Sequence, residues 1–409
     1  MNRKDAEGLD RADDLAPFRA RFELAERPIY MDGNSLGPPS SAVAAALTRA
    51  AREWQDDLVE GWETWIDRPG TVGDRLGRLL GAADGQVLVC DSTTVNLYKL
   101  AWAAIAHQAG RRVIVAEAGD FPTDRYVLQG LAETHGLQLR LVETRGDDPE
   151  GALEKAMDSD TALVCLSHVH FRTGRKLAAD RLTAAAHDRG ALILWDLAHS
   201  AGSVPVDLDG WEADLAVGCT YKHLNAGPGS PGFLYVRRSL QDDLRQPIWG
   251  WFGQDNQFEM ETAYRPRPGI GSFLAGTPGI LSLAAVDAAV ALVQSAGPIR
   301  LYAKAERMTR LLFESARERL VPLGADIITP KDPTRRGAHV SVSHPRAWPW
   351  CRALIDRRLV VADFRTPDVI RLGPGSLYSR FVDCYDAVEA MAQVMEDGFP
   401  DAAVRRRVT

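Results

Sequence analysis

Two side chains that could do chemistry together stand at the ends of apolar runs. Asp196 ends the run ALILWD, and Lys222 lies just beyond the run DLAVGC. Each run predicts a buried strand, and parallel strands bring the residues at their carboxyl ends to one edge of a sheet. An amine and a carboxylate at that edge suit pyridoxal 5'-phosphate, because the amine binds its aldehyde and the carboxylate keeps its pyridine nitrogen protonated. The alternative is a surface lysine and an aspartate that never meet.

Hydroxyl groups after an earlier apolar run could hold the phosphate of such a cofactor. Ser92, Thr93 and Thr94 lie between a strand predicted over 87–90 and a helix predicted from TTVNLYKLAWAAIAHQ. Hydroxyls and free amides at a helix N-terminus form a ready phosphate site. An ordinary helix cap would use the same residue types.

Four further residues could complete a cofactor and substrate site. Phe121, in DFPTDRY, could stack on a pyridine ring, and Asp124 could hydrogen-bond polar groups around it, although the same segment fits an exposed turn. His199 lies three residues after Asp196 and could orient that carboxylate or contact the ring, while a satisfied core histidine fits equally well. Arg371, after a strand near the C-terminus, could bind a substrate α-carboxylate in two bonds.

The elements that must position these residues alternate along the chain. From about residue 60 to 290, short apolar runs alternate with helical patterns, which predicts a mainly parallel sheet with crossover helices. A long amphipathic stretch then leads to a second region with strands near HVSVSH and DVIRLG. We therefore expect an α/β fold with a large cofactor-binding domain over 56–295 and a smaller α+β domain over 296–409. The N-terminal segment 1–55 would complete the small domain.

Composition and charge narrow the possible partners. The 409 residues carry a formal net charge of −7, which disfavours a nucleic-acid partner. The N-terminus lacks the apolar core of a signal peptide, and the most apolar long stretch, ILSLAAVDAAVALVQSAG, is too short and mild to span a bilayer. The five cysteines form no C-x-x-C pair. We expect no membrane partner and a reducing, cytoplasmic location.

At these residues the chain resembles the kynureninases, a family of fold-type-I pyridoxal phosphate enzymes. The resemblance covers nearly the whole chain, and Tyr-Lys-x-Leu-Asn-x-Gly together with Gly-Trp-Phe-Gly is hard to obtain by chance. The motifs that carry it are YMDGNSLG (30–37), DSTTVNLYKL (91–100), EAGDFPTDRY (117–126), WDLAHSAG (195–202), TYKHLNAGPGSPGFLYV (220–236), GWFG (250–253), GTPGIL (276–281) and RLGPGSLYSRF (371–381).

The resemblance implies a role for each matching position. Lys222 would hold the cofactor and later move the substrate α-proton, Asp196 would pair with the pyridine nitrogen, and Phe121 would stack on the ring. Trp251 and Thr277 would reach the phosphate from a neighbouring subunit, which implies a homodimer with the site at the subunit interface. The remaining cofactor contacts would come from Thr93, Thr94 and Tyr221 at the phosphate and from Asp124, His199 and Ser203 in the surrounding shell.

The reaction that the resemblance implies is hydrolysis of L-kynurenine to anthranilate and L-alanine, a step of tryptophan catabolism. Arg371 would bind the α-carboxylate, with Asn34, Ser35 and Trp62 also on the substrate side. Tyr221 is the candidate that passes a proton to Cβ. Thr277 and the bulky Trp62 favour L-kynurenine over 3-hydroxykynurenine, and no step needs a metal.

The chain departs from the family pattern at two positions, and other functions remain open. Gln254 stands where the family usually has histidine, and His223 where it often has tyrosine. A homologue acting on a modified kynurenine in secondary metabolism is therefore the main alternative. A cysteine desulfurase or selenocysteine lyase would need a reactive cysteine, for which Cys351 is the candidate. An aminotransferase would not need the GWFG context, and a cofactor-binding regulator would need a nucleic-acid-binding module.

One pair of histidines could suggest a metal. His168 and His170 are two residues apart in SHVHFRTGR, so a strand would place both on one face. A metal site would need further ligands, and no pattern in the sequence supplies them. We expect this pair to lie at a strand end near the cofactor.

Overall fold

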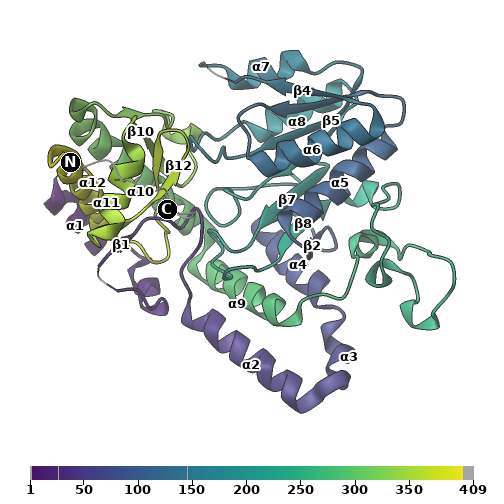
Figure 1. The fold of residues 1–409 in the computed structure, drawn as a ribbon. Helices are drawn as coiled ribbons and strands as arrows, with labels where there is room; N and C mark the ends of the chain where they lie inside the picture. Colours follow the sequence, from purple (N-terminus) through teal and green to yellow (C-terminus); the bar gives the residue numbers. More distant parts are fainter. Residues whose placement is uncertain (1, 26, 145, 399–409) are drawn as a thin grey trace.

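The computed structural model describes residues 2–25, 27–144 and 146–398, so the last residues of the predicted small domain, 399–409, lie outside it. Its largest element is a seven-stranded sheet in the order β2-β8-β7-β6-β5-β3-β4 (Figure 1). Neighbouring strands from β4 to β7 are parallel, whereas β8 is antiparallel to β7 and β2, which confirms the predicted mainly parallel sheet. The strands are β2 (Val87–Val89), β3 (Val113–Glu117), β4 (Gln138–Val142), β5 (Thr161–Ser167), β6 (Leu192–Asp196), β7 (Leu215–Cys219) and β8 (Gly232–Val236).

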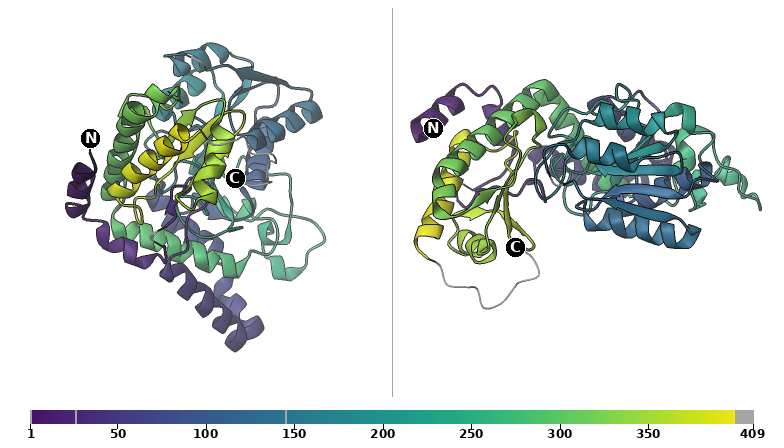
Figure 2. Two further views of the ribbon diagram at one scale, coloured as in Figure 1. Left: turned by 60° about the vertical axis from the view of Figure 1, so that its left-hand side comes forward. Right: turned by 90° about the horizontal axis from the view of Figure 1, so that it is seen from above.

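Helices cover both faces of this sheet, as Figure 2 shows from above. Alternate residues of each strand point to opposite faces, so the continuous apolar runs fill two separate cores. One core lies against α4 (Arg68–Leu79), α8 (Ala179–Asp188) and α9 (Ile280–Ala296). The other lies against α5 (Thr93–His107) and α6 (Pro122–His135), while α7 (Pro149–Ala156) packs near β4 and α8.

Most of the C-terminal part of the chain forms a second, smaller unit in which one sheet packs on helices. An antiparallel sheet in the order β12-β13-β10-β9 packs its apolar face on three helices. The N-terminal α1 (Arg3–Arg11) packs on α12, and β1 (Ile29–Tyr30) pairs with β11 (Val360–Val361). The other elements are β9 (Asp326–Ile327), β10 (Val340–Ser343), β12 (Asp363–Arg365), β13 (Val369–Leu372), α10 (Pro298–Arg319), α11 (Ala347–Asp356) and α12 (Phe381–Glu396).

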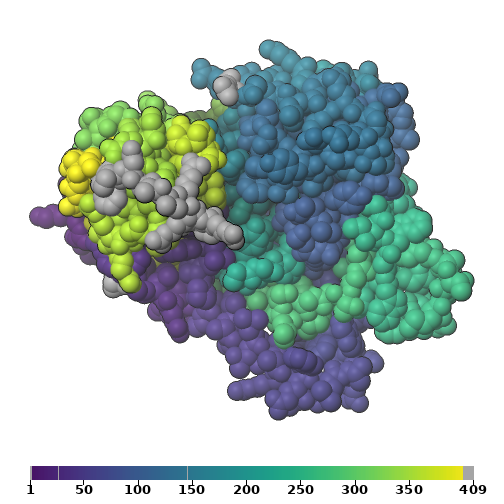
Figure 3. Space-filling model, viewed as in Figure 1, coloured from purple at the N-terminus to yellow at the C-terminus, as the bar shows by residue number. Residues whose placement is uncertain are grey.

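Two segments project from this body. Helix α2 (Ser41–Asp57) packs on α9 and extends to α3 (Trp62–Trp65) at the bottom of Figure 1. Ser40 caps the start of this helix, because its hydroxyl accepts a hydrogen bond from the Val43 amide at 3.3 Å. The long connection 237–279 carries only short 3-10 turns and protrudes at the right of the space-filling view (Figure 3).

The carboxyl ends of β5, β6 and β7 face the smaller sheet (Figure 1). Loops at this edge of an open α/β sheet are where ligands bind. Asp196 is the last residue of β6, and Lys222 follows β7 by three residues, so both lie at that edge as predicted. Arg371 reaches the same region from the smaller sheet, where it lies within β13 rather than after it.

Candidate active site

The Lys222 amine lies between an aromatic ring and a buried imidazole. Its Nζ is 3.1 Å from Nε2 of His199 and 5.9 Å from the centre of the Phe121 ring. Burial and the positive charge of Lys222 lower the pKa of His199 well below its usual value, so this imidazole is neutral. Because the Lys222 ammonium donates to Nε2, the neutral ring carries its proton on Nδ1. This Nδ1 is buried without a hydrogen-bond partner among the described residues, and it can therefore donate to a polar group of a ligand.

Two buried carboxyl groups lie close enough to Lys222 to interact with its charge. Asp124, in the first turn of α6, hydrogen-bonds Asp196, and burial followed by the Asp196 charge raises the pKa of Asp124 well above its usual value. Burial also raises the pKa of Asp196, but the Lys222 charge, the Ala198 amide and the Asp124 hydrogen bond oppose that rise. We therefore assign the shared proton to Asp124 and the negative charge to Asp196.

A pocket of about 470 Å³ opens at the N-terminus of α5 and is lined by Tyr221, the residue before Lys222. Thr93, Thr94, Tyr221 and Thr277 line it together, and Ser92 caps the helix by accepting a bond from the Val95 amide at 3.3 Å. Hydroxyls and helix amides of this kind suit a phosphate group. The resemblance implied that Thr277 comes from a neighbouring subunit, whereas here it lines the pocket of its own chain.

A fully buried lysine joins the two loops that form this pocket. Lys99 Nζ donates to Asp91 Oδ2 at 2.6 Å and to the Phe273 carbonyl at 2.8 Å, and its side chain is 0% exposed. Asp91 precedes the phosphate-site hydroxyls and has a left-handed backbone, with φ of 47°. The ion pair therefore holds this strained turn against the segment that continues to Thr277. Lys99 lies in the motif DSTTVNLYKL, but sequence analysis assigns it no role.

We expect Lys99→Met to weaken cofactor binding while the chain still folds. Methionine fills similar space but cannot donate to Asp91 or Phe273, and a charged hydrogen bond of this kind contributes about 1.5–3 kcal/mol, or roughly tenfold or more in affinity. Equilibrium dialysis of pyridoxal phosphate measures the change, with exposed Lys155→Met as the matched control. Unchanged affinity with a lowered melting temperature would mean that Lys99 supports only the fold.

The Arg371 guanidinium is buried among oxygen atoms from three segments. Nε donates to Asp363 Oδ1 at 2.7 Å, Nη2 also bonds the Asp363 carboxylate, and Nη1 donates to the Phe171 carbonyl at 2.7 Å. Nη2 lies 3.0 Å from Ser35 Oγ, and the Asn34 amide oxygen, when turned toward the guanidinium, accepts from Nε and Nη2 at 3.1 and 3.0 Å. The two-bond edge expected for a substrate carboxylate is thus held by Asp363.

A second carboxyl group lies in the same cluster. Burial, followed by repulsion from Asp363, raises the pKa of Asp32 to about 7. Between its ordinary pKa of 3.8 and 7, the folded chain holds one more proton at Asp32 than the unfolded chain does. The free energy of unfolding therefore falls as pH rises through that window, by at most about 1.4 kcal/mol per pH unit, and this effect is complete above pH 7.

We expect Asp32→Asn to remove this pH dependence. The variant should gain melting temperature relative to the wild type as pH rises from 5 to 7, with a constant difference above pH 7. Melting curves at pH 5, 6, 7 and 8 test this, with Asp188→Asn at the exposed end of α8 as control. A difference that does not grow between pH 5 and 7 contradicts the assignment.

Three residues that the sequence assigns to the site, Trp62, Trp251 and Ser203, have no described contact with Lys222 within one chain, and neither has Gln254, which departs from the family pattern. Trp62 packs on Phe252, with ring centres 5.8 Å apart, and the Trp251 indole donates to the Gln257 carbonyl at 2.9 Å. The Ser203 hydroxyl donates to the backbone carbonyl of His199 at 2.8 Å, so a local contact occupies it. Gln254 accepts a bond from the Arg265 amide at 2.7 Å and thereby fastens the protruding connection.

Two histidines lie at the site although sequence analysis assigns them no role there: His339 is not singled out, and His223 appears only as a departure from the family pattern. His339 and His223 are buried beside His199, with ring centres 5.6 and 6.3 Å from it. Burial lowers the pKa of both, so both are neutral. His339 precedes β10, nearly 120 positions from His223 along the chain, so only the packed sheets bring the two rings together.

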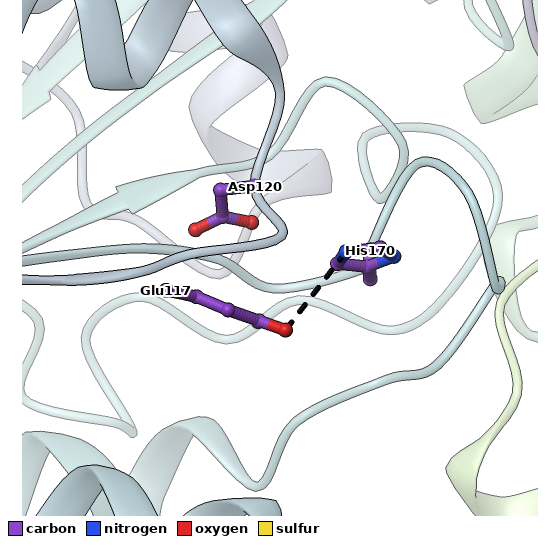
Figure 4. A group of neighbouring side chains, drawn as sticks. All are labelled: Glu117, Asp120 and His170. Atoms are coloured by element: carbon purple, nitrogen blue, oxygen red, sulfur yellow. Dashed lines mark ion pairs between the residues drawn. The ribbon is translucent and has the colours of Figure 1, made fainter. Parts of the chain in front are cut away.

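A separate cluster joins His170 to two acidic residues, as Figure 4 shows. Ligand atoms of Glu117, Asp120 and His170 all lie within 4.8 Å of one another, although the sequence suggested no further ligands for this histidine. His170 Nδ1 accepts backbone amides at 3.2 and 3.3 Å, so Nε2 carries the proton and donates to the Gly119 carbonyl at 2.8 Å. Arg175 Nη2 pairs with Glu117 at 2.6 Å. Glu117 Oε2 and Asp120 Oδ1 have no hydrogen-bond partner among the described residues, but both nitrogens of His170 are occupied, so we assign no metal to the cluster.

Cys351, the candidate for the reactive cysteine of a desulfurase, is unsuited to that role. Cys351 is 0% exposed in α11, and its thiol contacts the Ala362 carbonyl at 3.5 Å. Burial raises the pKa of this thiol, and a reactive cysteine needs the opposite shift and access to the substrate. The site therefore does not support the desulfurase alternative.

The residues present fit pyridoxal phosphate. A lysine amine, an ionised carboxylate, a stacking ring and a hydroxyl-lined helix N-terminus converge at one sheet edge. The unpartnered, buried Nδ1 of His199 and Oδ2 of Asp124 require a polar group that the described chain does not provide. The fold and the site define a pyridoxal phosphate enzyme of fold type I.

Comparisons with known proteins agree with this class and narrow it. Among solved structures, a C-DES mutant with glycine covalently linked to the PLP cofactor has a TM-score of 0.82 at 19% identity, covering 93% of this chain and 99% of that chain. The cysteine desulfurase from Thermococcus onnurineus has a TM-score of 0.81 at 20% identity, covering 93% and 98%. At such identities the likeness shows the fold alone.

Sequence relatives identify the family. Kynureninase from Pseudomonas fluorescens is 44% identical over 403 residues, which cover 96% of this chain and 95% of that protein. Kynureninase from Burkholderia pseudomallei is 41% identical and covers 100% of this chain and 99% of that protein. Residues 301–391 match the kynureninase C-terminal domain. This chain belongs to the kynureninase family. Within the described part of the chain, no single helix has the length and apolar character needed to cross a membrane.

Proposed function

We propose that this protein hydrolyses the Cβ–Cγ bond of L-kynurenine to give anthranilate and L-alanine. Family membership supports the reaction, and one observation of the site carries it. The Lys222 amine lies 3.1 Å from a neutral imidazole, above the Phe121 ring and beside the Asp196 carboxylate. This is the arrangement needed to hold a pyridoxal ring and to move protons at its substrate face.

Bound pyridoxal phosphate supplies an electron sink for the bonds at Cα. Lys222 would hold the cofactor and then carry the α-proton, with His199 Nε2 orienting the amine through their 3.1 Å contact. Asp196 would present its negative charge to the pyridine nitrogen, and Asp124 would fix that carboxylate by donating its proton. Phe121 would stack on the ring.

Tyr221 lines the phosphate pocket and is our candidate for a proton donor. Burial raises the pKa of its phenol, so the group stays protonated at neutral pH and can serve as an acid. We assign it the proton that Cβ receives when the bond breaks. Thr93 and Thr94 would hold the phosphate beside it.

On the substrate side, Arg371 would meet the α-carboxylate with Asn34 and Ser35 close by. The resemblance favours L-kynurenine over its 3-hydroxy analogue, because Trp62 matches the bulky aromatic residue of kynurenine-preferring enzymes and Thr277 stands where enzymes that prefer 3-hydroxykynurenine often have asparagine. A modified kynurenine remains the second candidate, since Gln254 departs from the family pattern. Equal turnover of L-kynurenine and 3-hydroxykynurenine would contradict this preference.

We further propose a homodimer in which Trp251 reaches the site of the partner, while Thr277 lines the pocket of its own chain. Apolar side chains are exposed on the α2 end and on the protruding connection, and a large exposed apolar surface is typical of an interface. These side chains are Trp54, Leu58, Val59, Ile248, Trp249, Phe258 and Met260. Mixing inactive Lys222→Ala and Trp251→Ala subunits should restore part of the activity, because one site of each mixed dimer is then intact. Activity that does not return contradicts a shared site.

We place the enzyme in the cytoplasm. All five cysteines are free and buried. A disulfide bridge, which an oxidising compartment would favour, would require two of them to leave their buried positions. Cell fractionation followed by immunoblotting tests the location.

The direct test of the reaction mixes the cofactor-loaded protein with L-kynurenine and follows anthranilate fluorescence. Equimolar anthranilate and alanine are the expected products, and 3-hydroxykynurenine run alongside ranks the two substrates. No product from either substrate would contradict the proposed function.

A further inference from the structure

The Arg371 guanidinium has few N–H groups left for a ligand. An arginine side chain has five N–H groups. The Asp363 carboxylate accepts the Nε N–H group and one Nη2 N–H group. Ser35 and Asn34 share the other Nη2 N–H group, and the Phe171 carbonyl accepts one Nη1 N–H group. One Nη1 N–H therefore remains among the described contacts. Arg371 cannot hold a carboxylate by two bonds unless it releases Asp363.

Asp363 is the built-in partner of Arg371. The two residues are directly opposite in the antiparallel pair of β12 and β13, where cross-strand side chains meet. Both side chains are 1% exposed. Although burial opposes it, the hydrogen bond and charge of Arg371 lower the pKa of Asp363 to about 2, so this carboxylate is ionised. Such a pair fixes the plane of the guanidinium.

A second arginine joins the same carboxylate. Arg365 follows Asp363 by two residues on β12, so both side chains lie on one face of the strand. Arg365 Nη2 is 2.6 Å from Asp363 Oδ2 and 3.2 Å from Ser35 Oγ. Its Nε is buried without a hydrogen-bond partner among the described residues, while the side chain as a whole is 35% exposed. Arg365 therefore has an unused N–H at this end of the site.

The cluster carries one more positive charge than negative charge, so it can bind one anion. Two guanidinium groups face the Asp363 carboxylate, and Asp32 is protonated below about pH 7. One positive charge is then uncompensated in a mostly buried cluster, which favours a single carboxylate ligand.

The cluster is also close to the reacting end of the site. The Phe171 carbonyl, which accepts from Arg371, belongs to a residue whose ring meets Phe121 edge-on at 5.3 Å. Phe121 lies below Lys222. An amino-acid ligand whose amino group is at Lys222 would therefore extend its carboxylate toward the two guanidinium groups.

We propose that Arg365 binds the substrate α-carboxylate together with Arg371, and that Asp363 is the positioning residue that holds both guanidinium groups. This inference rests on the proposed function, because it assigns the carboxylate end of the same site. Ser35 completes the cluster, since its hydroxyl donates to Asp363 Oδ2 at 2.6 Å and accepts from both arginines.

The test compares two ligands that differ in the carboxylate. L-Alanine carries the α-carboxylate, and ethylamine lacks it. Dissociation constants are measured on the cofactor-loaded protein from the change in its absorbance spectrum, for the wild type, Arg365→Gln and Asp363→Asn. Arg319→Gln, which removes a distant ion pair with Glu389, is the matched control.

For Arg365→Gln we expect L-alanine to bind about tenfold or more weakly and ethylamine to bind as in the wild type. Asp363→Asn should also weaken L-alanine selectively, and should raise KM for L-kynurenine with kcat little changed. Wild-type affinity for L-alanine in Arg365→Gln overturns the role of Arg365. Tighter L-alanine binding in Asp363→Asn would show that Asp363 competes with the ligand instead of positioning its partners.

Folding and function are separated by two further measurements. If Asp363→Asn does not fold, Arg365→Lys still tests the arginine, because it keeps the charge but loses the planar fork and should recover only part of the affinity. A wild type that does not prefer L-alanine over ethylamine overturns the inference even if it cleaves kynurenine. A wild type with that preference that leaves kynurenine intact overturns only the proposed function.

Discussion

Lys222→Ala should abolish turnover of L-kynurenine, with a loss on the order of 10⁴-fold or more. The substitution removes the amine that holds the cofactor and carries the α-proton, and no second lysine is described near Phe121 or His199. Anthranilate fluorescence measures the loss. Borohydride reduction followed by mass spectrometry should find the cofactor attached to Lys222 in the wild type and to no lysine in the variant.

The fold should survive this change. Lys222 makes one side-chain hydrogen bond, to His199, and the surrounding core does not depend on its stem. The melting temperature without cofactor should therefore stay close to that of the wild type, and Lys155→Ala on α7 serves as the matched control. Wild-type turnover by Lys222→Ala, or cofactor attached at another lysine, refutes the assignment.

The sequence was sufficient to predict those site residues that lie at the ends of strands. Asp196 and Lys222 could be placed because each follows an unbroken apolar run, and parallel strands bring their carboxyl ends together. The hydroxyls at Thr93 and Thr94 could be placed for the same reason, since a capped helix follows β2. The parallel strands of the seven-stranded sheet could be predicted in the same way, whereas the antiparallel direction of β8 could not.

The residues that tune these groups could not be predicted, because their contacts depend on tertiary packing. Lys99 reads as an ordinary helix position, yet it joins the phosphate loop to a segment more than 170 residues away. Asp363 and Arg371 are separated by a short turn, and only the register of β12 on β13 makes them partners. Within the chain, Trp62 packs on Phe252 and the Trp251 indole bonds Gln257, so neither meets Lys222. The sequence implied a neighbouring subunit for Trp251 but not for Trp62.

The two buried carboxyl groups beside Lys222 should respond very differently to the same substitution. Asp196→Asn keeps the size and shape of the side chain but removes the negative charge that would stabilise a protonated pyridine nitrogen. We expect kcat to fall on the order of 10²–10³-fold, the usual cost of removing a preorganised electrostatic group. Cofactor binding should persist, because Thr93, Thr94 and Lys222 are unchanged.

Asp124→Asn is the matched variant, because Asp124 carries the shared proton. The asparagine amide can still donate to Asp196, so the substitution changes only the geometry of this hydrogen bond. We therefore expect kcat to fall less than about tenfold. Stopped-flow and steady-state assays on both variants at pH 7 compare them directly. Equal losses would mean that the negative charge is shared between the two groups. A larger loss in Asp124→Asn would place that charge on Asp124 and would reverse the assignment of which carboxyl group faces the cofactor.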